Sequence, residues 1–432
     1  MTTANVLLWG SKIGAVTWRE DQEIGIFQYY PDFTRSQIQI SPIVMRLRES
    51  PYSFPELPRN TFHGLPGLLA DSLPDKFGNA IIDAWLASEG RSPASFNSVE
   101  RLCYIGQRGM GALEYEPALL EPPTKSKIVE VAKLAELADR ILNTRSSLAG
   151  MFNGVDDKAA LEDIIRVGTS AGGARAKAIL AWNPVTNEFR SGQIDIGPDF
   201  EHWLLKFDGI SNNRDKEIAD PLGYGKIEFA YSLIAREIGI EMSECKLHHE
   251  GGRSHFMTKR FDRTKSRGKI HMQSLGALAH YDLNLAGGYS YEQALQTMKR
   301  MRLPMPDLEQ QVMRAMLNVV GRNQDDHVKN IAFLMDRAGN WRLAPAFDVT
   351  YAYNPGGQWT NQHQMSINGK REDFTRGDLT SLAEKAGIKK NKSNAMLDEV
   401  IDIFRGWDDY AKTAQIEEKT ANKIKKTFRL DL

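Results

Sequence analysis

The stretch that most constrains the architecture of this chain is a polar loop followed by a short hairpin. Residues Asn323 to Asn330 read Asn-Gln-Asp-Asp-His-Val-Lys-Asn, and the apolar run Ile331 to Leu334 follows directly. Past Gly339 comes a second run, Trp341 to Val349. Two short apolar runs separated by a turn that contains glycine are typical of a β-hairpin. The sequence therefore predicts a hairpin here, with the polar loop immediately before it.

Three polar side chains on this hairpin have the spacing that phosphoryl transfer uses. Asn330 lies five residues after Asp325, and Asp348 lies 18 residues after Asn330. The reaction needs a carboxylate near the acceptor hydroxyl and oxygen ligands for the magnesium ion that neutralises the phosphates. Protein kinases obtain these groups from a catalytic-loop Asp, an Asn five positions later and a second Asp beyond a hairpin. We therefore expect Asp325 to be the base or hydroxyl-orienting residue, and Asn330 and Asp348 to be metal ligands.

Neighbouring residues of the same loop are candidates for secondary roles. Asp326 lies only four residues before Asn330, so it fits the spacing less well than Asp325. Lys329 could balance phosphate charge, and His327 could either hydrogen-bond the loop or approach the terminal phosphate. Any one of these residues alone is more typical of a solvated turn. The ordered set of three on one hairpin favours a catalytic site instead.

A glycine-rich stretch upstream is a candidate phosphate-binding loop. It runs from Val167 to Lys177 between two strand-like runs and includes Ser170, Gly172 and Gly173. Glycines there would let backbone amides close over phosphate oxygens. The stretch is neither a Walker A sequence nor a G-x-G-x-x-G motif. Taken alone, it fits an ordinary glycine hairpin better.

Lys206 and Glu228 are a candidate ion pair. Lys206 interrupts the apolar run Trp203 to Phe207, where a charge is unfavourable unless it is paired or exposed. Glu228 lies at the start of a helix predicted over Lys226 to Ile238, which Gly239 would end. A Lys–Glu pair sets phosphate geometry in kinases. A plain surface lysine would fit the same pattern.

The segment Met257 to Arg263 is expected to connect the β-rich part of the chain to the helical part. Backbone groups of such a connector would face the adenine edge. A carboxylate such as Asp262 could then bind ribose hydroxyls, although an Arg-Asp-Arg surface turn fits the residues as well.

The order of expected elements predicts an α+β fold. Strands are expected around Gly10, at Ile164 to Val167 and at Lys177 to Trp182, and a helix at Phe77 to Ser88. After Phe261 the chain is expected to be mostly helical. A β-rich N-terminal lobe followed by a mainly helical C-terminal lobe is the layout of a two-lobed, protein-kinase-like transferase, and other α+β proteins share it. We expect an N-terminal β-rich subdomain over residues 1–125, a nucleotide-binding N-lobe over 126–262 and a helical C-lobe over 263–432.

Composition excludes several classes of protein. The 432 residues include 55 basic and 55 acidic side chains, and this balance removes the electrostatic basis for a dedicated nucleic-acid binder. Any DNA contact would be local or shared with a partner. Only Cys103 and Cys245 are present, so a disulfide framework and a four-cysteine zinc site are excluded. We expect a reduced, cytoplasmic protein with no leader and no membrane-spanning run.

Taken together, these motifs resemble the HipA family of serine/threonine kinases, the toxin halves of bacterial HipA–HipB toxin–antitoxin pairs. The resemblance covers nearly the whole chain. The segments that carry it are Leu68 to Asp75, Gly173 to Lys177, Trp203 to Phe207, Arg260 to Arg263, Asp325 to Asn330 and Pro345 to Asp348. It implies ATP- and magnesium-dependent phosphorylation of a protein serine.

The resemblance also implies roles for particular residues. Asp325 would be the catalytic Asp, Asn330 and Asp348 would hold magnesium, and Lys206 would contact the ATP phosphates.

On the nucleotide side, the Phe261 backbone would meet adenine and Asp262 would lie near the ribose. Ser170 falls where the family autophosphorylates its phosphate-binding loop. That event is expected to eject the loop and silence the enzyme, because a dianion repels the phosphates of ATP.

The family's partners set further expectations. Its antitoxin is a helix-turn-helix dimer that carries the toxin onto operator DNA, so this chain would meet DNA only through a HipB-like protein. Its targets include aminoacyl-tRNA synthetases. Two alternatives stay open: a catalytically idle co-repressor scaffold for such an antitoxin, and a kinase that acts on a lipid or small molecule.

Overall fold

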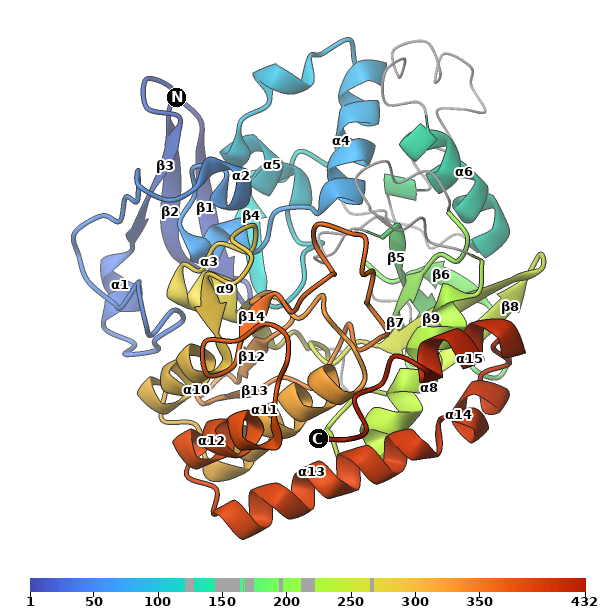
Figure 1. The fold of residues 1–432 in the computed structure, drawn as a ribbon. Helices are drawn as coiled ribbons and strands as arrows, with labels where there is room; N and C mark the ends of the chain where they lie inside the picture. The colour runs from blue at the N-terminus through green and yellow to red at the C-terminus, as the bar shows by residue number, and fades with distance from the viewer. Residues whose placement is uncertain are drawn as a thin grey trace.

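The computed structural model describes residues 1–120, 128–143, 164–165, 167, 175–193, 197–210, 222–264 and 268–432. Within them, two antiparallel sheets dominate the first part of the chain and helices dominate the last part (Figure 1). The predicted α+β fold, with a β-rich N-terminal lobe and a mainly helical C-terminal lobe, is confirmed. None of the helices among these residues has the length and apolar character needed to cross a bilayer.

The first sheet has four antiparallel strands in the order β3-β2-β1-β4. Its strands are β1 (Thr3–Leu8), β2 (Ser11–Arg19), β3 (Ile24–Tyr29) and β4 (Leu113–Glu116). Trp9 and Gly10 join β1 to β2 and both have positive φ, 51° and 80°. Positive φ at both central residues gives the turn that matches the twist of a hairpin. The strand pair predicted around Gly10 is therefore confirmed.

Helices lie in the chain between β3 and β4 of the first sheet. They are α1 (Pro31–Thr34), α2 (Arg59–Phe62), α3 (Gly67–Ala70), α4 (Lys76–Ser88), the 3-10 turn η1 (Pro93–Ser95) and α5 (Ser98–Ile105). Asp75 caps α4 by accepting a hydrogen bond from the Gly78 amide at 2.7 Å. The helix predicted over Phe77 to Ser88 is thus present, one residue longer at its start.

The second sheet has five antiparallel strands in the order β6-β5-β7-β9-β8. They are β5 (Lys177–Trp182), β6 (Phe189–Ser191), β7 (Glu201–Lys206), β8 (Cys245–Glu250) and β9 (Arg253–Lys259). Apolar side chains of β5 and β7 share a core with α4 and α6 (Val131–Asn143), whereas α8 (Tyr224–Glu237) packs on β8 and β9. α8 ends just before Gly239, which has φ 84°.

The last part of the chain is built from helices around two small sheets. The helices are α9 (Leu275–Ala279), α10 (Tyr291–Arg300), α11 (Met305–Val320), α12 (Arg376–Ala386), α13 (Lys390–Arg405), α14 (Trp407–Thr413) and α15 (Glu418–Lys425). The strands are β10 (His271–Ser274), β11 (Tyr289–Ser290), β12 (Ala332–Met335), β13 (Trp341–Leu343) and β14 (Met365–Ser366). Met335 pairs with Trp341 across the turn at Gly339, so the predicted hairpin is confirmed.

One predicted strand is wrong. Ile164, Ile165 and Val167 are helical, and all three are buried in the core shared with α4 and α6. A short, wholly buried apolar run has no periodicity that separates a strand from a helix.

The domain boundaries stay predictions. The boundary placed at residues 125–126 lies outside the described residues, and the one placed at 262–263 falls in the connection between β9 and β10.

Candidate active site

The polar loop lies between the end of α11 and the start of β12. Asp325 accepts a hydrogen bond at Oδ1 from Trp359 Nε1 (2.6 Å), and its backbone oxygen accepts one from Asn330 Nδ2 (2.7 Å). The second bond closes the loop on itself and places Asn330 beside Asp325. Because the amide nitrogen of Asn330 is used in this bond, its amide oxygen is the group that it can offer to a ligand.

Asp326 has a different environment from its neighbour Asp325. Its carboxylate is 1% exposed and accepts three hydrogen bonds of 2.8 Å, from the Tyr291 hydroxyl, His363 Nδ1 and the Gln364 amide. A buried carboxylate with three donors is a structural anchor. Asp326 therefore holds the loop in place, and its oxygens are not available to a substrate.

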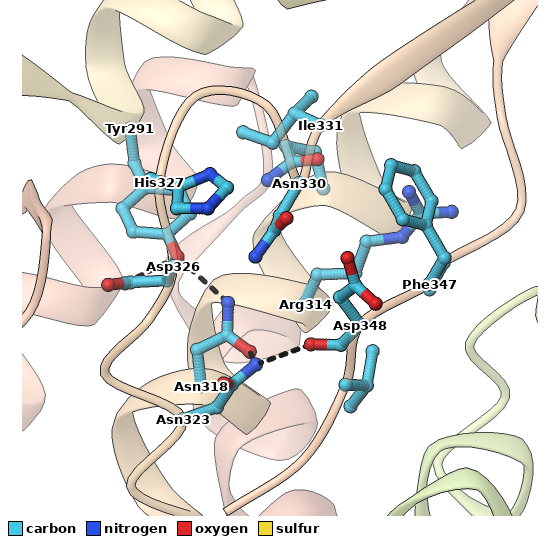
Figure 2. A pocket seen from close by; sticks show the side chains of 13 residues that line it. Tyr291, Arg314, Asn318, Asn323, Asp326, His327, Asn330, Ile331, Phe347 and Asp348 are labelled. Carbon is cyan, nitrogen blue, oxygen red and sulfur yellow. Dashed lines mark hydrogen bonds between the residues drawn. The ribbon is translucent and has the colours of Figure 1, made fainter. Parts of the chain in front are cut away.

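Asp348 lies beyond the hairpin and faces the loop. Its backbone φ is 53°, in the left-handed region that residues other than glycine rarely adopt. Asn323 Nδ2 lies 3.5 Å from its backbone oxygen. Figure 2 shows the side chains of Asn330 and Asp348 next to each other at the same pocket. The strained conformation brings the carboxylate toward the loop, and such strain is typical of functional sites.

Lys206 is a buried cation between two carboxylates. It ends β7, and its Nζ pairs with Glu228 of α8 and with Asp348. Burial on its own would lower the pKa of Lys206, but Asp348 and Glu228 outweigh it and raise that pKa. The ammonium therefore stays charged. The predicted pairing of Lys206 with Glu228 is confirmed, and Arg175 adds a second cation 3.3 Å from Glu228.

The carboxylate of Asp348 is held in its ionised form. Burial would raise its pKa, but the charges of Lys206 and Lys177 outweigh burial, and His327 acts in the same direction, so the pKa falls to about 2. An ionised carboxylate is the form that binds a metal ion.

The predicted glycine loop can be followed only at its end. Ser170, Gly172 and Gly173 lie outside the described residues. Lys177, at the start of β5, pairs with Asp75 at 3.0 Å, and both side chains are at most 3% exposed. Burial, more than any other influence, raises the pKa of Asp75. The N-terminal part of the chain thus reaches a lysine that the sequence assigns to the nucleotide site.

His327 and Lys329 lie at the rim of the loop. His327 Nδ1 accepts a hydrogen bond from the Lys329 amide at 3.3 Å, which is the loop-bonding role considered for it. Lys329 Nζ lies 3.9 Å from Asp71 Oδ1. The contact of Lys329 with a phosphate stays a prediction.

The role predicted for Asp262 is wrong. Its side chain is fully buried, and it accepts hydrogen bonds from Arg260 (2.8 and 2.6 Å), Arg263 (2.8 Å) and the Gly111 amide (2.7 Å). Burial would raise the pKa of Asp262, but the two arginines hold it well below its usual range. With every one of these donors in place, neither oxygen can reach a ribose. The surface-turn alternative is wrong for the same reason.

Phe261 lies one residue earlier in the chain and faces the site. Its ring packs against Phe347, with 5.8 Å between centroids, directly beside Asp348. The position agrees with a backbone that borders the nucleotide, and the adenine contact itself stays a prediction.

The oxygen donors at this pocket fit magnesium. Asn330 and Asp348 line it together, and one amide and one carboxylate oxygen are the hard ligands that Mg²⁺ takes alongside waters and phosphate oxygens. Among the residues that the structure describes, no group of three or more His, Cys, Asp or Glu side chains could hold a metal by itself. A magnesium ion at Asn330 and Asp348 would therefore depend on phosphate oxygens for the rest of its ligands.

Sequence reasoning missed two contacts of this site. Asp75 precedes an apolar helical run, which is the usual position of an N-cap, so the sequence could have indicated its capping role. Nothing in the sequence indicates its ion pair with Lys177. Trp359 lies 34 residues after Asp325 in a stretch without regular structure, and nothing local indicates that its indole reaches the carboxylate.

Comparisons with known proteins agree on one family. A family model of the HipA-like C-terminal domain matches residues 169–407, and a model of the HipA N-terminal domain matches residues 4–116. No curated protein sequence matches the chain.

Two solved structures give a measure of the similarity in fold. The HipA, HipB and operator DNA complex of Shewanella oneidensis MR-1 matches with a TM-score of 0.68 and 17% identity, over 98% of this chain and 95% of the other. The Helicobacter pylori proinflammatory kinase CtkA matches with a TM-score of 0.36 and 12% identity, over 54% of this chain and 89% of the other.

Proposed function

This chain belongs to the HipA family, and from that premise we propose that it is an ATP- and magnesium-dependent serine/threonine protein kinase, the toxin of a toxin–antitoxin pair. The observation that carries the proposal is the placement of Lys206 between Glu228 and Asp348, with Asp325 and Asn330 on the facing loop. A cation for phosphates, two oxygen ligands for a metal and a carboxylate for the acceptor are the parts that phosphoryl transfer needs.

Each of these side chains has a definite task in the proposed reaction. Lys206 binds phosphate oxygens, and Glu228 holds its ammonium in position. Asn330 and Asp348 would hold the magnesium ion, which supplies positive charge against the phosphates. Asp325 has Oδ1 fixed by Trp359, so its other oxygen can accept the proton of the incoming hydroxyl.

The proposed partner is a HipB-like helix-turn-helix antitoxin. The Shewanella structure is a complex of HipA with HipB and operator DNA, which supports a similar assembly here. The balanced charge of this chain agrees with DNA contact that runs mainly through the antitoxin. The proposed substrate is a serine or threonine of a protein such as an aminoacyl-tRNA synthetase, and the proposed regulatory site is Ser170. Two buried free cysteines, Cys103 and Cys245, suit a reducing, cytoplasmic location.

Nucleotide binding separates this proposal from an idle scaffold. A ligand that prefers the native state raises the melting temperature, and the rise grows with the logarithm of ligand concentration divided by Kd. We expect ATP with magnesium to raise the melting temperature of the wild type, and EDTA or Asp348→Asn to remove most of that rise. Asp409→Asn, an exposed position in α14, is the matched control and should behave like wild type. A melting temperature that does not respond to magnesium and ATP would favour the scaffold.

A further inference from the structure

The segment Thr427–Leu432, here called the tail, follows α15 and returns to the polar loop. Figure 1 shows it in red as it runs from α15 toward the end of α11. The Arg429 amide donates to the Val320 backbone oxygen at 3.0 Å, and the guanidinium donates to the Val319 oxygen at 2.7 Å. The tail is therefore fixed at the end of α11, directly before the loop that carries Asp325.

The guanidinium of Arg429 reaches the anchor of the loop through one histidine. Nη1 of Arg429 lies 3.1 Å from His363 Nε2, and His363 Nδ1 lies 2.8 Å from Asp326 Oδ2. Arginine can only donate hydrogen bonds, so Nε2 must be the accepting nitrogen of the ring. The proton of the neutral imidazole is then on Nδ1, where it is donated to Asp326. Arg429 thus selects the tautomer that holds the carboxylate.

Arg429 also belongs to a cluster of charged side chains around this contact. Arg322 and Arg429 both pair with Glu372, at 2.7 and 2.6 Å, and Asp326 is the second carboxylate of the group. Among the described residues, Asp326 has no ion pair with a lysine or an arginine. His363 is the only basic side chain there that contacts its carboxylate. Removing Arg429 would take one of its two arginine partners from Glu372, whose side chain is 26% exposed, and would leave His363 Nε2 without this donor.

A displacement of Asp326 would be passed on to the residue that precedes it in the chain. Asp325 precedes Asp326 directly, and the hydrogen bond from Asn330 to the Asp325 backbone closes the same loop. A shift of the anchor would therefore move both the base and a metal ligand.

We propose that Arg429 is a positioning residue for the catalytic loop, acting through His363 and Asp326. This inference rests on the proposed function for its kinetic consequence, but the positioning itself is a structural property that can be measured separately.

Hydrogen–deuterium exchange of the peptide that spans residues 323–331 is the first measurement. Arg429→Ala should raise exchange in that peptide relative to wild type. The matched control is Arg376→Ala, which removes another contact of the tail, 2.7 Å from Arg376 Nη2 to the Leu432 backbone oxygen, without touching His363. The control should leave exchange in the loop unchanged. Equal exchange in wild type and Arg429→Ala would overturn the inference, whatever the activity.

Kinetics is the second measurement. A small misplacement of a reacting group far from the mutated side chain can lower a rate by about 10²-fold. We expect Arg429→Ala to lower kcat by between about tenfold and about 10²-fold. The KM for ATP should change little, because the substitution does not touch Lys206. A loss confined to KM would contradict the inference. If the wild type transfers no phosphate, the proposed function is refuted. The hydrogen–deuterium exchange comparison would still test whether Arg429 positions the loop.

A pair of variants at His363 protects the test against simple unfolding. The amide nitrogen of Asn can replace Nδ1 as the donor to Asp326, but Asn has no group at the Nε2 position. In the His363→Asn background the substitution Arg429→Ala should therefore have a smaller effect on loop exchange than it has in wild type. Equal effects in the two backgrounds would show that Arg429 does not act through His363. If Arg429→Ala does not fold, Arg429→Lys, which keeps the charge but not the forked donor, takes its place in both backgrounds.

Discussion

At the scale of single residues, two adjacent aspartates of the polar loop have opposite environments. Asp325 is partly exposed with one oxygen fixed by Trp359, whereas Asp326 is buried with three donors. Spacing alone separated the two in the sequence, because only Asp325 lies five residues before Asn330. The anchoring role of Asp326 had no local signal, since its donors come from positions 35 to 38 residues away.

The contrast between these aspartates leads to a prediction about stability. Asp326→Ala leaves three buried donors without an acceptor, so we expect it to lower the free energy of unfolding by about 3 kcal/mol. Asp325→Ala loses one hydrogen bond at a partly exposed site, and we expect a loss of about 1 kcal/mol or less. Urea unfolding followed by tryptophan fluorescence measures both variants. Equal losses would show that Asp326 is not the anchor of the loop.

Asp262 shows where residue-level reasoning failed. An acidic residue between two arginines in a connector reads equally as a ligand or as a surface turn, and the structure shows neither. Its third donor is the amide of Gly111, which lies 151 residues earlier. A buried ion-pair centre of this kind depends on tertiary contacts that no local pattern reports.

At the scale of elements, turn glycines and helix caps were the most reliable signals. The hairpin of β12 and β13 and the helices α4 and α8 were predicted to within a few residues, because turn glycines and caps mark their ends. The run Ile164 to Val167 was misjudged as a strand because a short, wholly buried apolar run fits a strand, as in the equally buried β12, and a helix alike. Burial on every side removes the alternation on which such predictions depend.

The N-terminus of α4 carries a prediction at this scale. Asp75 both caps α4 and pairs with buried Lys177. Asp75→Asn keeps a good cap but removes the charge opposite Lys177, and we expect it to destabilise the protein by about 3 kcal/mol. Asp75→Ala also loses the cap, which should add about 1 kcal/mol.

Denaturant unfolding of the two variants at position 75 separates the ion pair from the cap. Asp83→Asn, further along the same helix, removes a more exposed ion pair, 3.6 Å from Arg101, and is the control for losing a carboxylate away from the cap. If Asp75→Asn were as stable as wild type, the pair with Lys177 would not contribute to stability.

At the scale of the whole molecule, the candidate site draws on three parts of the chain. Asp75 comes from the segment between β3 and β4 of the first sheet, Lys206 and Glu228 from the second sheet and α8, and Asp325 and Asp348 from the helical part. Sequence motifs assigned chemical roles only to the last two parts, although Leu68 to Asp75 of the first part is among the segments that carry the family resemblance. The contribution of the first part required the fold, because an ion pair between residues 75 and 177 has no sequence signature.

The most direct test of a phosphoryl-transfer site is the rate of phosphate transfer from labelled ATP in the presence of magnesium, with the modified peptide identified by mass. We predict that wild type transfers phosphate, including to the fragment that holds Ser170, and that Asp325→Ala is slower by about 10² to 10⁴-fold while it stays folded. Transfer by Asp325→Ala at the wild-type rate, or no transfer by folded wild type with any protein acceptor, would contradict the account.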